Sequence, residues 1–211
     1  PAAPADAESI FAAREAARAA ETLADLRAVL EAFEGCALKR TAANLVFGDG
    51  SETGPLMVVG EAPGADEDRQ GLPFVGPSGQ LLDAMMRWAG LSRDRARIAN
   101  ILPWRPPGNR TPTPQEVAIM RPFIARQIAL VRPKAILFLG GSSAKTLLDT
   151  DEGVTRLRGK WRDCAIDGLS DPIPALATFH PAFLLRQPGR KREAWRDILT
   201  VAQRLREAET A

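Results

Sequence analysis

Residues 58–79 read VVGEAPGADEDRQGLPFVGPSG, and this stretch decides the expected fold. The apolar residues 56–59 are typical of a buried strand, which the following glycine and proline residues end abruptly. Glu61 therefore lies at the carboxyl end of a strand, where open α/β sheets bind their ligands. Phe74 follows on a short loop between a proline and a glycine, where its ring can be held against a flat ligand. A purely structural interpretation, with a strand, an acidic turn and a buried phenylalanine, accounts for the same residues.

Apolar segments and helical patterns alternate along the rest of the chain. Further strands are expected at residues 97–102, 135–139 and 174–179. One long or two short helices are expected within residues 8–33. Further helices are expected at 80–88, at 115–131, from the end of residues 140–143 to 148, and at 191–205. Residues 153–168 are expected to form a hairpin or a loop. The alternation predicts an α/β protein with three layers, α/β/α, around a central, mainly parallel four-stranded sheet.

The length of the chain limits it to one domain or two small ones. It has 211 residues, of which 45% are hydrophobic, which is enough for a substantial core. We expect an N-terminal helical extension over residues 1–34 and a main domain over residues 35–211, packed as one compact unit.

The charge of the chain is nearly balanced, with 28 basic and 26 acidic residues and a formal net charge of +2. A polyanionic partner must therefore meet a local basic patch. Residues 180–206 are rich in arginine and could supply one, although a solvated helix face has the same composition. No apolar run is long enough to cross a bilayer, and a cytoplasmic protein is expected. Cys36 and Cys164 lie far apart in the sequence and are expected to be reduced thiols.

Three of the predicted strands end in distinctive polar residues, which are Glu61, Asn100 and His180. The carboxyl ends of parallel strands lie on one edge of a sheet, so these residues could share one pocket. His180 is the only histidine, and a lone histidine is more often structural, but its place at a strand end favours a site. The amide of Asn100 offers an acceptor beside a donor. This pair matches the N3–H donor and O4 acceptor of uracil, whereas cytosine presents the reverse pattern.

The motifs resemble a known family when they are taken together. GEAPG with an acidic pair, GLPFVG, Asn100 ahead of RPPGNRTP, and HPAFLL occur in this order, as in family 4 uracil-DNA glycosylases of the uracil-DNA glycosylase superfamily. The resemblance runs from about Cys36 to the end of the closing helix. It implies a monofunctional DNA-repair hydrolase that releases uracil from DNA and leaves an abasic site. It also implies the uracil-DNA glycosylase fold.

The resemblance implies a role for each matching residue. Glu61 and His180 are the expected catalytic residues: Glu61 orients or activates the attacking water, and His180 bonds uracil O2 and stabilises the departing anion. The other matching residues are expected to bind the flipped base. The backbone at Ala62 binds O2, Glu67 crowds C5 and excludes the thymine methyl, Phe74 stacks on the base, and Asn100 reads its edge.

The sequence departs from the family at its metal site. The family holds a 4Fe–4S cluster with four cysteines, and the flanking motifs align these positions with Phe33, Cys36, Trp104 and Met120. Only Cys36 keeps a thiol, and one thiolate cannot hold a cluster that needs four ligands. We therefore expect no iron–sulfur cluster and no other cofactor, with the three replacements filling the vacated volume by apolar packing.

DNA containing uracil, single- or double-stranded, is the partner implied by the resemblance, and a monomer is expected. Arg105, Arg110 and Arg158 are candidates for phosphate contacts. Residues after His180 are expected to form a loop, from which Phe183, Leu184 or Arg186 could wedge into the base stack that the flipped nucleotide leaves, although Phe183 and Leu184 also suit a core.

Other functions fit parts of the sequence. Residues 140–146, GGSSAKT, end like a nucleotide-binding P-loop but lack its required glycine, so a helix N-terminus packed on the sheet is expected instead. A glycosylase with a broader range, for xanthine or hypoxanthine, is one alternative. A non-catalytic or covalent binder of uracil-containing DNA is another, although residues 104–113 contain no histidine of the kind that relatives forming a covalent adduct use.

Overall fold

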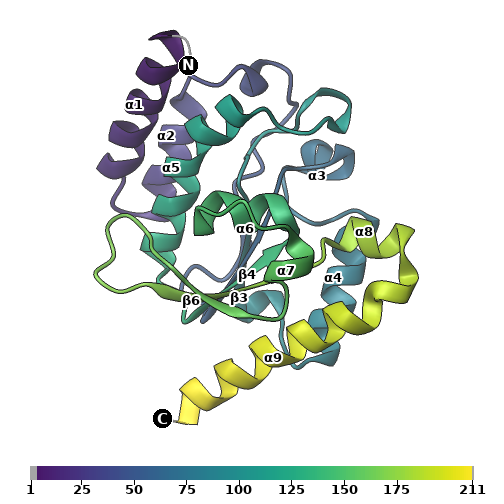
Figure 1. Cartoon of the computed structure of the whole chain (residues 1–211). Coiled ribbons are helices and arrows are strands. Elements are labelled where there is room, and N and C mark those ends of the chain that lie inside the picture. The colour runs from purple at the N-terminus through teal and green to yellow at the C-terminus, as the bar shows by residue number, and fades with distance from the viewer. Residues whose placement is uncertain (1–3, 211) are drawn as a thin grey trace.

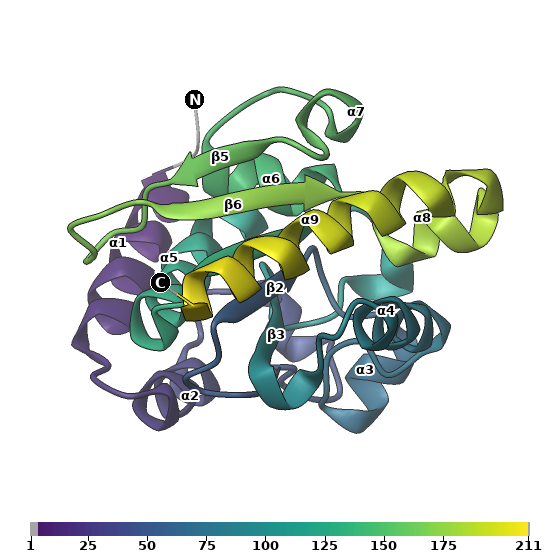
Figure 2. The same cartoon turned by 90° about the horizontal axis from the view of Figure 1, so that it is seen from below.

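A six-stranded sheet forms the centre of the protein, with helices on both faces (Figure 1, Figure 2). The computed structural model describes residues 4–210, so residues 1–3 of the predicted extension and residue 211 lie outside it. The strands are β1 (Asp49–Gly50), β2 (Leu56–Gly60), β3 (Ala96–Asn100), β4 (Ala135–Leu139), β5 (Trp161–Cys164) and β6 (Ile173–Thr178). The α-helices are α1 (Pro4–Ala19), α2 (Leu23–Ala32), α3 (Ala65–Gln70), α4 (Pro77–Trp88), α5 (Pro114–Val131), α6 (Gly141–Leu148), α7 (Val154–Leu157), α8 (Pro181–Arg186) and α9 (Lys191–Thr210). Short 3-10 turns are η1 (Ala37–Arg40), η2 (Arg93–Arg95), η3 (Pro107–Asn109) and η4 (Pro188–Arg190).

The strand order is β1-β3-β2-β4-β6-β5, and the central strands β3, β2, β4 and β6 are parallel. These are the four strands that the sequence predicts. The two edge strands, β1 and β5, pair antiparallel and were not predicted. The α/β class with a mainly parallel sheet is confirmed, and the strand count is corrected from four to six. Residues 153–168, expected to form a hairpin or a loop, contain the short helix α7 and the strand β5, which forms an antiparallel pair with β6.

The strands send alternate side chains to two separate apolar layers. On β2, Met57 and Val59 pack with α1, α2, α5 and α6, whereas Leu56 and Val58 pack with α4, α8 and α9. Figure 1 shows α1, α2 and α5 on one side of the sheet and α9 on the other. The central strands are buried on both faces, which explains why their sequences are almost continuously apolar.

The N-terminal helices belong to the first of these layers. Thr22 begins α2 with a capping box, in which its side chain accepts from the Asp25 amide and the Asp25 carboxylate accepts from the Thr22 amide. The predicted helical segment is therefore two helices. Leu26 and Leu30 are buried in the same core as the sheet. The division of the chain after residue 34 stays a prediction.

The longest helix, α9, closes the opposite layer. Ile198, Val201 and Leu205 on its inner side are buried against the sheet, and charged residues occupy its outer side. Within residues 4–210, none of the helices combines the length and the apolar character needed to cross a membrane.

The order of connections places a switch point at the end of β2. The chain leaves β2 through α4, on one face, to reach β3, and then returns through α5, on the other face, to β4 on the opposite side of β2. In open α/β sheets, ligands bind outside the carboxyl ends of strands at such a point. The fold therefore directs the search for a site to the residues that follow β2.

Candidate active site

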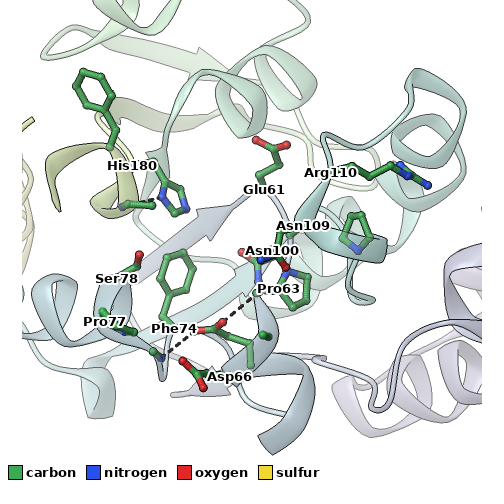
Figure 3. A pocket seen from close by; sticks show the side chains of 18 of the residues that line it. Glu61, Pro63, Asp66, Phe74, Pro77, Ser78, Asn100, Asn109, Arg110 and His180 are labelled. Atoms are coloured by element: carbon green, nitrogen blue, oxygen red, sulfur yellow. Dashed lines mark hydrogen bonds between the residues drawn. The ribbon is translucent and has the colours of Figure 1, made fainter. Parts of the chain in front are cut away.

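A cavity of about 610 Å³ opens at the carboxyl edge of the parallel strands. Glu61 follows β2, Asn100 ends β3 and His180 follows β6, and all three line the cavity (Figure 3). Phe74, between α3 and α4, forms another wall. The predicted convergence of three strand ends is thus present. The chemical roles of these residues stay predictions.

Asn100 lines this cavity and carries a buried acceptor without a hydrogen-bond partner. The residue is 6% exposed, and within residues 4–210 its Oδ1 is the only buried side-chain nitrogen or oxygen without a hydrogen-bond partner. The sheet register pairs Asn100 with Gly60, where a Cβ atom would lie 2.4 Å from Oδ1 and 2.6 Å from the Phe74 ring. Glycine is therefore needed for the close approach. An unpaired buried acceptor is unfavourable, and a ligand donor would satisfy it.

Phe74 presents its ring from a constrained backbone. Its φ angle is 54°, in the left-handed region that bulky residues rarely adopt, and the side chain is 5% exposed. The ring centroid lies 5.7 Å from that of His180, with 33° between the ring planes. Together the two rings form an apolar and a polar wall of the same cavity, as Figure 3 shows. Such walls suit a flat heterocycle with polar edges.

His180 is held in one tautomer. It precedes α8 as its N-cap, and its Nδ1 accepts a hydrogen bond of 3.1 Å from the amide of Ala182. In the neutral ring, the proton is therefore on Nε2. The pKa of His180 is lowered to about 4: burial is the largest cause, the charge of Arg186 acts in the same direction, and the charge of Glu67 opposes the shift. At neutral pH the ring is an uncharged donor.

Glu61 is half-buried, and burial raises the pKa of its carboxyl group, while a hydrogen bond with the side chain of Ser142 opposes this rise. Ser142 lies in the first turn of α6, directly after β4. From its sequence this segment is expected only as a helix N-terminus, and the contact with Glu61 was not predicted. The strand-end rule that selected the other site residues would also have drawn attention to the residues after β4.

Glu67 lines the cavity with both carboxylate oxygens engaged. Oε1 accepts from the amides of Val75 (3.0 Å) and Gly76 (2.9 Å), and Oε2 accepts from the amide of Gly64 (3.1 Å). The carboxylate thus joins the loop after β2 to the loop that carries Phe74. Ala62 also lines the cavity. Two predictions stay predictions here: that Glu67 contacts C5 of uracil, and that the backbone at Ala62 contacts O2.

The three arginines predicted to contact phosphate differ in their surroundings. Arg110 lines the cavity and is exposed, and its guanidinium donates to both carboxylate oxygens of Glu116 (2.9 and 2.6 Å). Arg105 lies outside the cavity lining and donates to Asn109 Oδ1 (2.7 Å).

Arg158 lies away from the cavity in a buried ionic network. It donates to both carboxylate oxygens of Asp197 (3.1 and 2.8 Å) and pairs with Glu193 (3.2 Å). Thr178 donates to the same Asp197 carboxylate (2.7 Å), and the Arg158 guanidinium lies over the Phe179 ring. These contacts tie α9 to the end of β6. They do not fit the predicted phosphate contact, because the paired guanidinium of Arg158 is also mostly buried and lies outside the cavity lining, unlike that of Arg110.

The residues after His180 form α8 rather than a loop. Phe183 lines the cavity and packs on Phe179 (5.0 Å between centroids), and Arg186 lines it from the exposed side. Leu184 is 1% exposed within the core, so it offers no apolar surface for insertion into DNA. Leu185, which was not predicted, is 43% exposed.

The positions aligned with cluster ligands lie in one apolar environment. Cys36, Trp104 and Met120 are buried in the apolar layer that contains α1, α2 and α5. Phe33 packs against this layer, and its ring centroid lies 5.1 Å from that of Phe123. Burial raises the pKa of the Cys36 thiol. Among residues 4–210, no group of three or more His, Cys, Asp or Glu residues is arranged to hold a metal ion. One protonated thiol among aromatic and thioether groups does not fit a cluster held by four thiolates.

Comparison with known proteins places this site in a family context. The profile described as the uracil DNA glycosylase superfamily matches residues 47–199. A type-4 uracil-DNA glycosylase of Archaeoglobus fulgidus is 34% identical over 187 residues, which cover 87% of this chain and 93% of the relative. A relative of the same name from Thermotoga maritima is 38% identical over 165 residues, covering 78% of this chain and 82% of the relative. A third, from Pyrobaculum aerophilum, is 36% identical over 180 residues, with 83% and 91% covered.

Proposed function

The chain belongs to the uracil-DNA glycosylase superfamily, and on that premise we propose that it hydrolyses the N-glycosidic bond of deoxyuridine in DNA. The products are free uracil and an abasic site, as DNA repair requires. The observation that carries the proposal is the unpaired Oδ1 of the buried Asn100, a residue that lines the same cavity as the Phe74 ring and the neutral His180. The Asn100 acceptor suits an N–H donor on the edge of a base, the Phe74 ring suits its flat face, and the His180 donor suits one of its carbonyl oxygens.

We propose that the extruded uracil stacks on Phe74 and pairs with the Asn100 amide. Oδ1 accepts from N3–H, and Nδ2 donates to O4. The Nε2–H of His180 donates to O2. Cytosine presents an acceptor at N3 and a donor at the exocyclic amine, so it would meet Asn100 with the wrong pattern. Ala62 and Glu67 line the same cavity and support a close fit around O2 and C5.

The reaction then needs little covalent chemistry from the protein. As the bond between N1 and C1′ breaks, its electron pair moves to the uracil, and the neutral His180 donor stabilises the anion at O2. Positive charge develops on the sugar, and the carboxylate of Glu61 stabilises it and orients the water that attacks C1′. Glu61 accepts the proton of that water, and the uracil anion is protonated after it leaves. Burial of Glu61, which raises the pKa of its carboxyl group, makes it a better base.

The test is single-turnover excision on an oligonucleotide with one deoxyuridine, followed by alkaline cleavage at the abasic site. Matched oligonucleotides with thymine, hypoxanthine or xanthine at the same position measure the base range. We expect cleavage with uracil. Turnover on hypoxanthine or xanthine at a similar rate would favour the broader glycosylase. Uracil-DNA that is bound or covalently held without an abasic product would favour the binding protein.

We propose that the protein works without an iron–sulfur cluster, since three of the four aligned ligand positions carry Phe33, Trp104 and Met120. Purified protein is expected to contain far less than one iron and one acid-labile sulfide per chain. Excision activity should survive prolonged treatment with an iron chelator. Near-stoichiometric iron and sulfide in purified protein, with loss of activity on chelation, would contradict this proposal.

A base inside a duplex cannot reach the cavity, so we propose that the nucleotide flips out of the stack. Arg186 and Arg110, exposed on the cavity lining, are the proposed phosphate contacts, and the exposed Leu185 and the half-buried Phe183 are the proposed wedges. Arg158 and Leu184 are not retained in these roles, Arg186 moves from the predicted wedge to a phosphate contact, and the phosphate contact of Arg105 stays a prediction. A monomer acting in the cytoplasm stays a prediction.

Neutralising Arg186 tests the phosphate contact. The change Arg186→Gln is expected to weaken binding to uracil-free DNA and to lower the slope of log affinity against log salt by about 1. Arg14→Gln is the control, since Arg14 is exposed on α1, which does not line the cavity. Equal slopes for Arg186→Gln and the unmodified protein, measured by fluorescence anisotropy, would exclude the contact.

A further inference from the structure

The loop that carries Phe74 is held in an unfavourable conformation inside the protein. Among residues 4–210, the non-glycine residues with positive φ are Phe74, Asn109, Arg132 and Asp149. Arg132 and Asp149 end helices, and Asn109 lies on an exposed turn, where this conformation is common. Phe74 alone among them is aromatic and buried. Such a conformation persists only where its surroundings over-determine it.

Two charged side chains fix the peptide groups on both sides of Phe74. Arg93, in η2, donates from Nη1 to the carbonyl oxygen of Pro73 (3.1 Å) and from Nη2 to the carbonyl oxygen of Phe74. Glu67 accepts from the next two amides, those of Val75 and Gly76. We name Arg93 and Glu67 the Phe74 clamp. The two carbonyl oxygens accept from the cationic Arg93, and the two amides donate to the anionic Glu67. Charge-assisted hydrogen bonds therefore fix the backbone on both sides of Phe74.

The arginine of this clamp is itself fixed by two acids. Its Nη1 donates to Asp49 of β1 (2.8 Å), and its Nε donates to Asp83 of α4 (2.8 Å). The four acceptors come from three separate segments of the chain and occupy all three guanidinium nitrogens. A lysine cannot reproduce this planar arrangement of donors. The guanidinium therefore links the sheet edge and α4 to the loop under the aromatic ring.

The helix that follows the loop leaves the Phe74 carbonyl no room to rotate away. A Cβ atom at Gly79, in the first part of α4, would lie 1.7 Å from the Phe74 carbonyl oxygen. At the other end, a Cβ atom at Gly60 would lie 2.6 Å from the ring. Gly60 thus confines the ring of Phe74, and Gly79 confines its carbonyl group. Arg93 provides the polar partner of that confined carbonyl.

We propose that Arg93 is a positioning residue that sets the stacking ring for catalysis by holding Phe74 in its left-handed conformation. Arg93 does not line the cavity, so it acts through Phe74 and not on the base. The inference rests on the proposed function, in which Phe74 stacks on uracil. A small error in the position of a group that orients the substrate can cost about 10²-fold in rate.

The test is a double-mutant cycle read by single-turnover uracil excision. Arg93→Met is expected to lower the rate by about 10- to 100-fold in the unmodified background, since the ring loses its fixed position. In a Phe74→Leu background, the same change should lower the rate by less than about 3-fold, because the group it positions is already gone. Arg93→Lys should fall between Arg93→Met and the unmodified protein.

Arg95→Met is the matched control. Arg95 lies on the same 3-10 turn, is exposed, and pairs with Glu209 far from the cavity, so the rate should stay within about 2-fold. Thermal melting of each variant shows whether it is folded, and Arg93→Lys replaces Arg93→Met in the cycle if the latter fails to fold.

Each outcome of the cycle identifies the proposal that fails. If Phe74→Leu lowers the rate and Arg93→Met costs the same factor in both backgrounds, Arg93 acts independently of Phe74 and the positioning role is wrong. If Phe74→Leu leaves the rate unchanged, the proposed stacking role is wrong, and the role of Arg93 falls with it. Absence of excision by the unmodified protein would overturn the proposed function itself.

Discussion

Replacing Asn100 with aspartate is expected to lower the single-turnover rate of uracil excision by about 10³-fold. The change keeps the size of the side chain and the acceptor for uracil N3–H, but it replaces the Nδ2 donor with a charged oxygen. That oxygen would face uracil O4, which is also an acceptor, inside a site where Asn100 is 6% exposed. Both the lost hydrogen bond and the repulsion grow as negative charge develops on the leaving base.

A second asparagine offers a matched control for this substitution. Asn109 lines the same cavity from an exposed turn, and its Oδ1 accepts from the Nε of Arg105. Asn109→Asp adds the same charge near the cavity and keeps that acceptor, so excision should fall by no more than about 5-fold. Equal losses in the two variants would show that charge near the cavity, and not base reading, explains the effect of Asn100→Asp.

The sequence predicts the central sheet well because its strands are continuous apolar runs. Residues 135–139 were predicted with the bounds that β4 has, since both faces of this strand are buried. The edge strand β5 was not predicted as a strand because only one of its four residues is buried and three of them are polar or amphipathic. Strand β1 has only two residues. Helix α8 was taken for a loop because it has only 6 residues, although a proline at its first position is typical of a helix start.

The candidate site was predictable where its residues follow strand ends, and not where they act through distant partners. Glu61, Asn100 and His180 could be found because parallel strands bring their carboxyl ends to one edge. Arg158 was misplaced because its partner Asp197 lies 39 residues further along the chain. The role of Arg93 was not predicted because the four groups it binds come from three separate segments of the chain. Ionic pairing depends on tertiary contacts that no local pattern encodes.

The removal of the imidazole of His180 is expected to lower the single-turnover rate by about 10²- to 10³-fold, which is the usual cost of one fixed donor to a developing anion. The variant is His180→Ala. Loss of the cap on α8, whose Ala182 amide bonds to Nδ1, would also lower the free energy of unfolding by about 1 kcal/mol. Arg158→Met, which removes contacts at the same strand end without touching the cavity, controls for destabilisation of that end. A similar loss in both variants at equal stability would argue against a direct role of the ring.

The pH dependence of the rate separates His180 from Glu61. The pKa of His180 is lowered to about 4, so the ring is neutral and its titration adds no change in rate between about pH 5.5 and pH 8. The pKa of Glu61 is raised above its ordinary value, so its carboxylate becomes protonated as the pH falls through that raised pKa, and the rate should fall with it. The acid limb should therefore persist in His180→Ala, at a lower rate, and disappear in Glu61→Gln. A different result would be an acid limb centred near the ordinary histidine pKa and lost in His180→Ala. That result would require a charged imidazolium in the resting site, which the burial of the ring and the nearby charge of Arg186 both oppose.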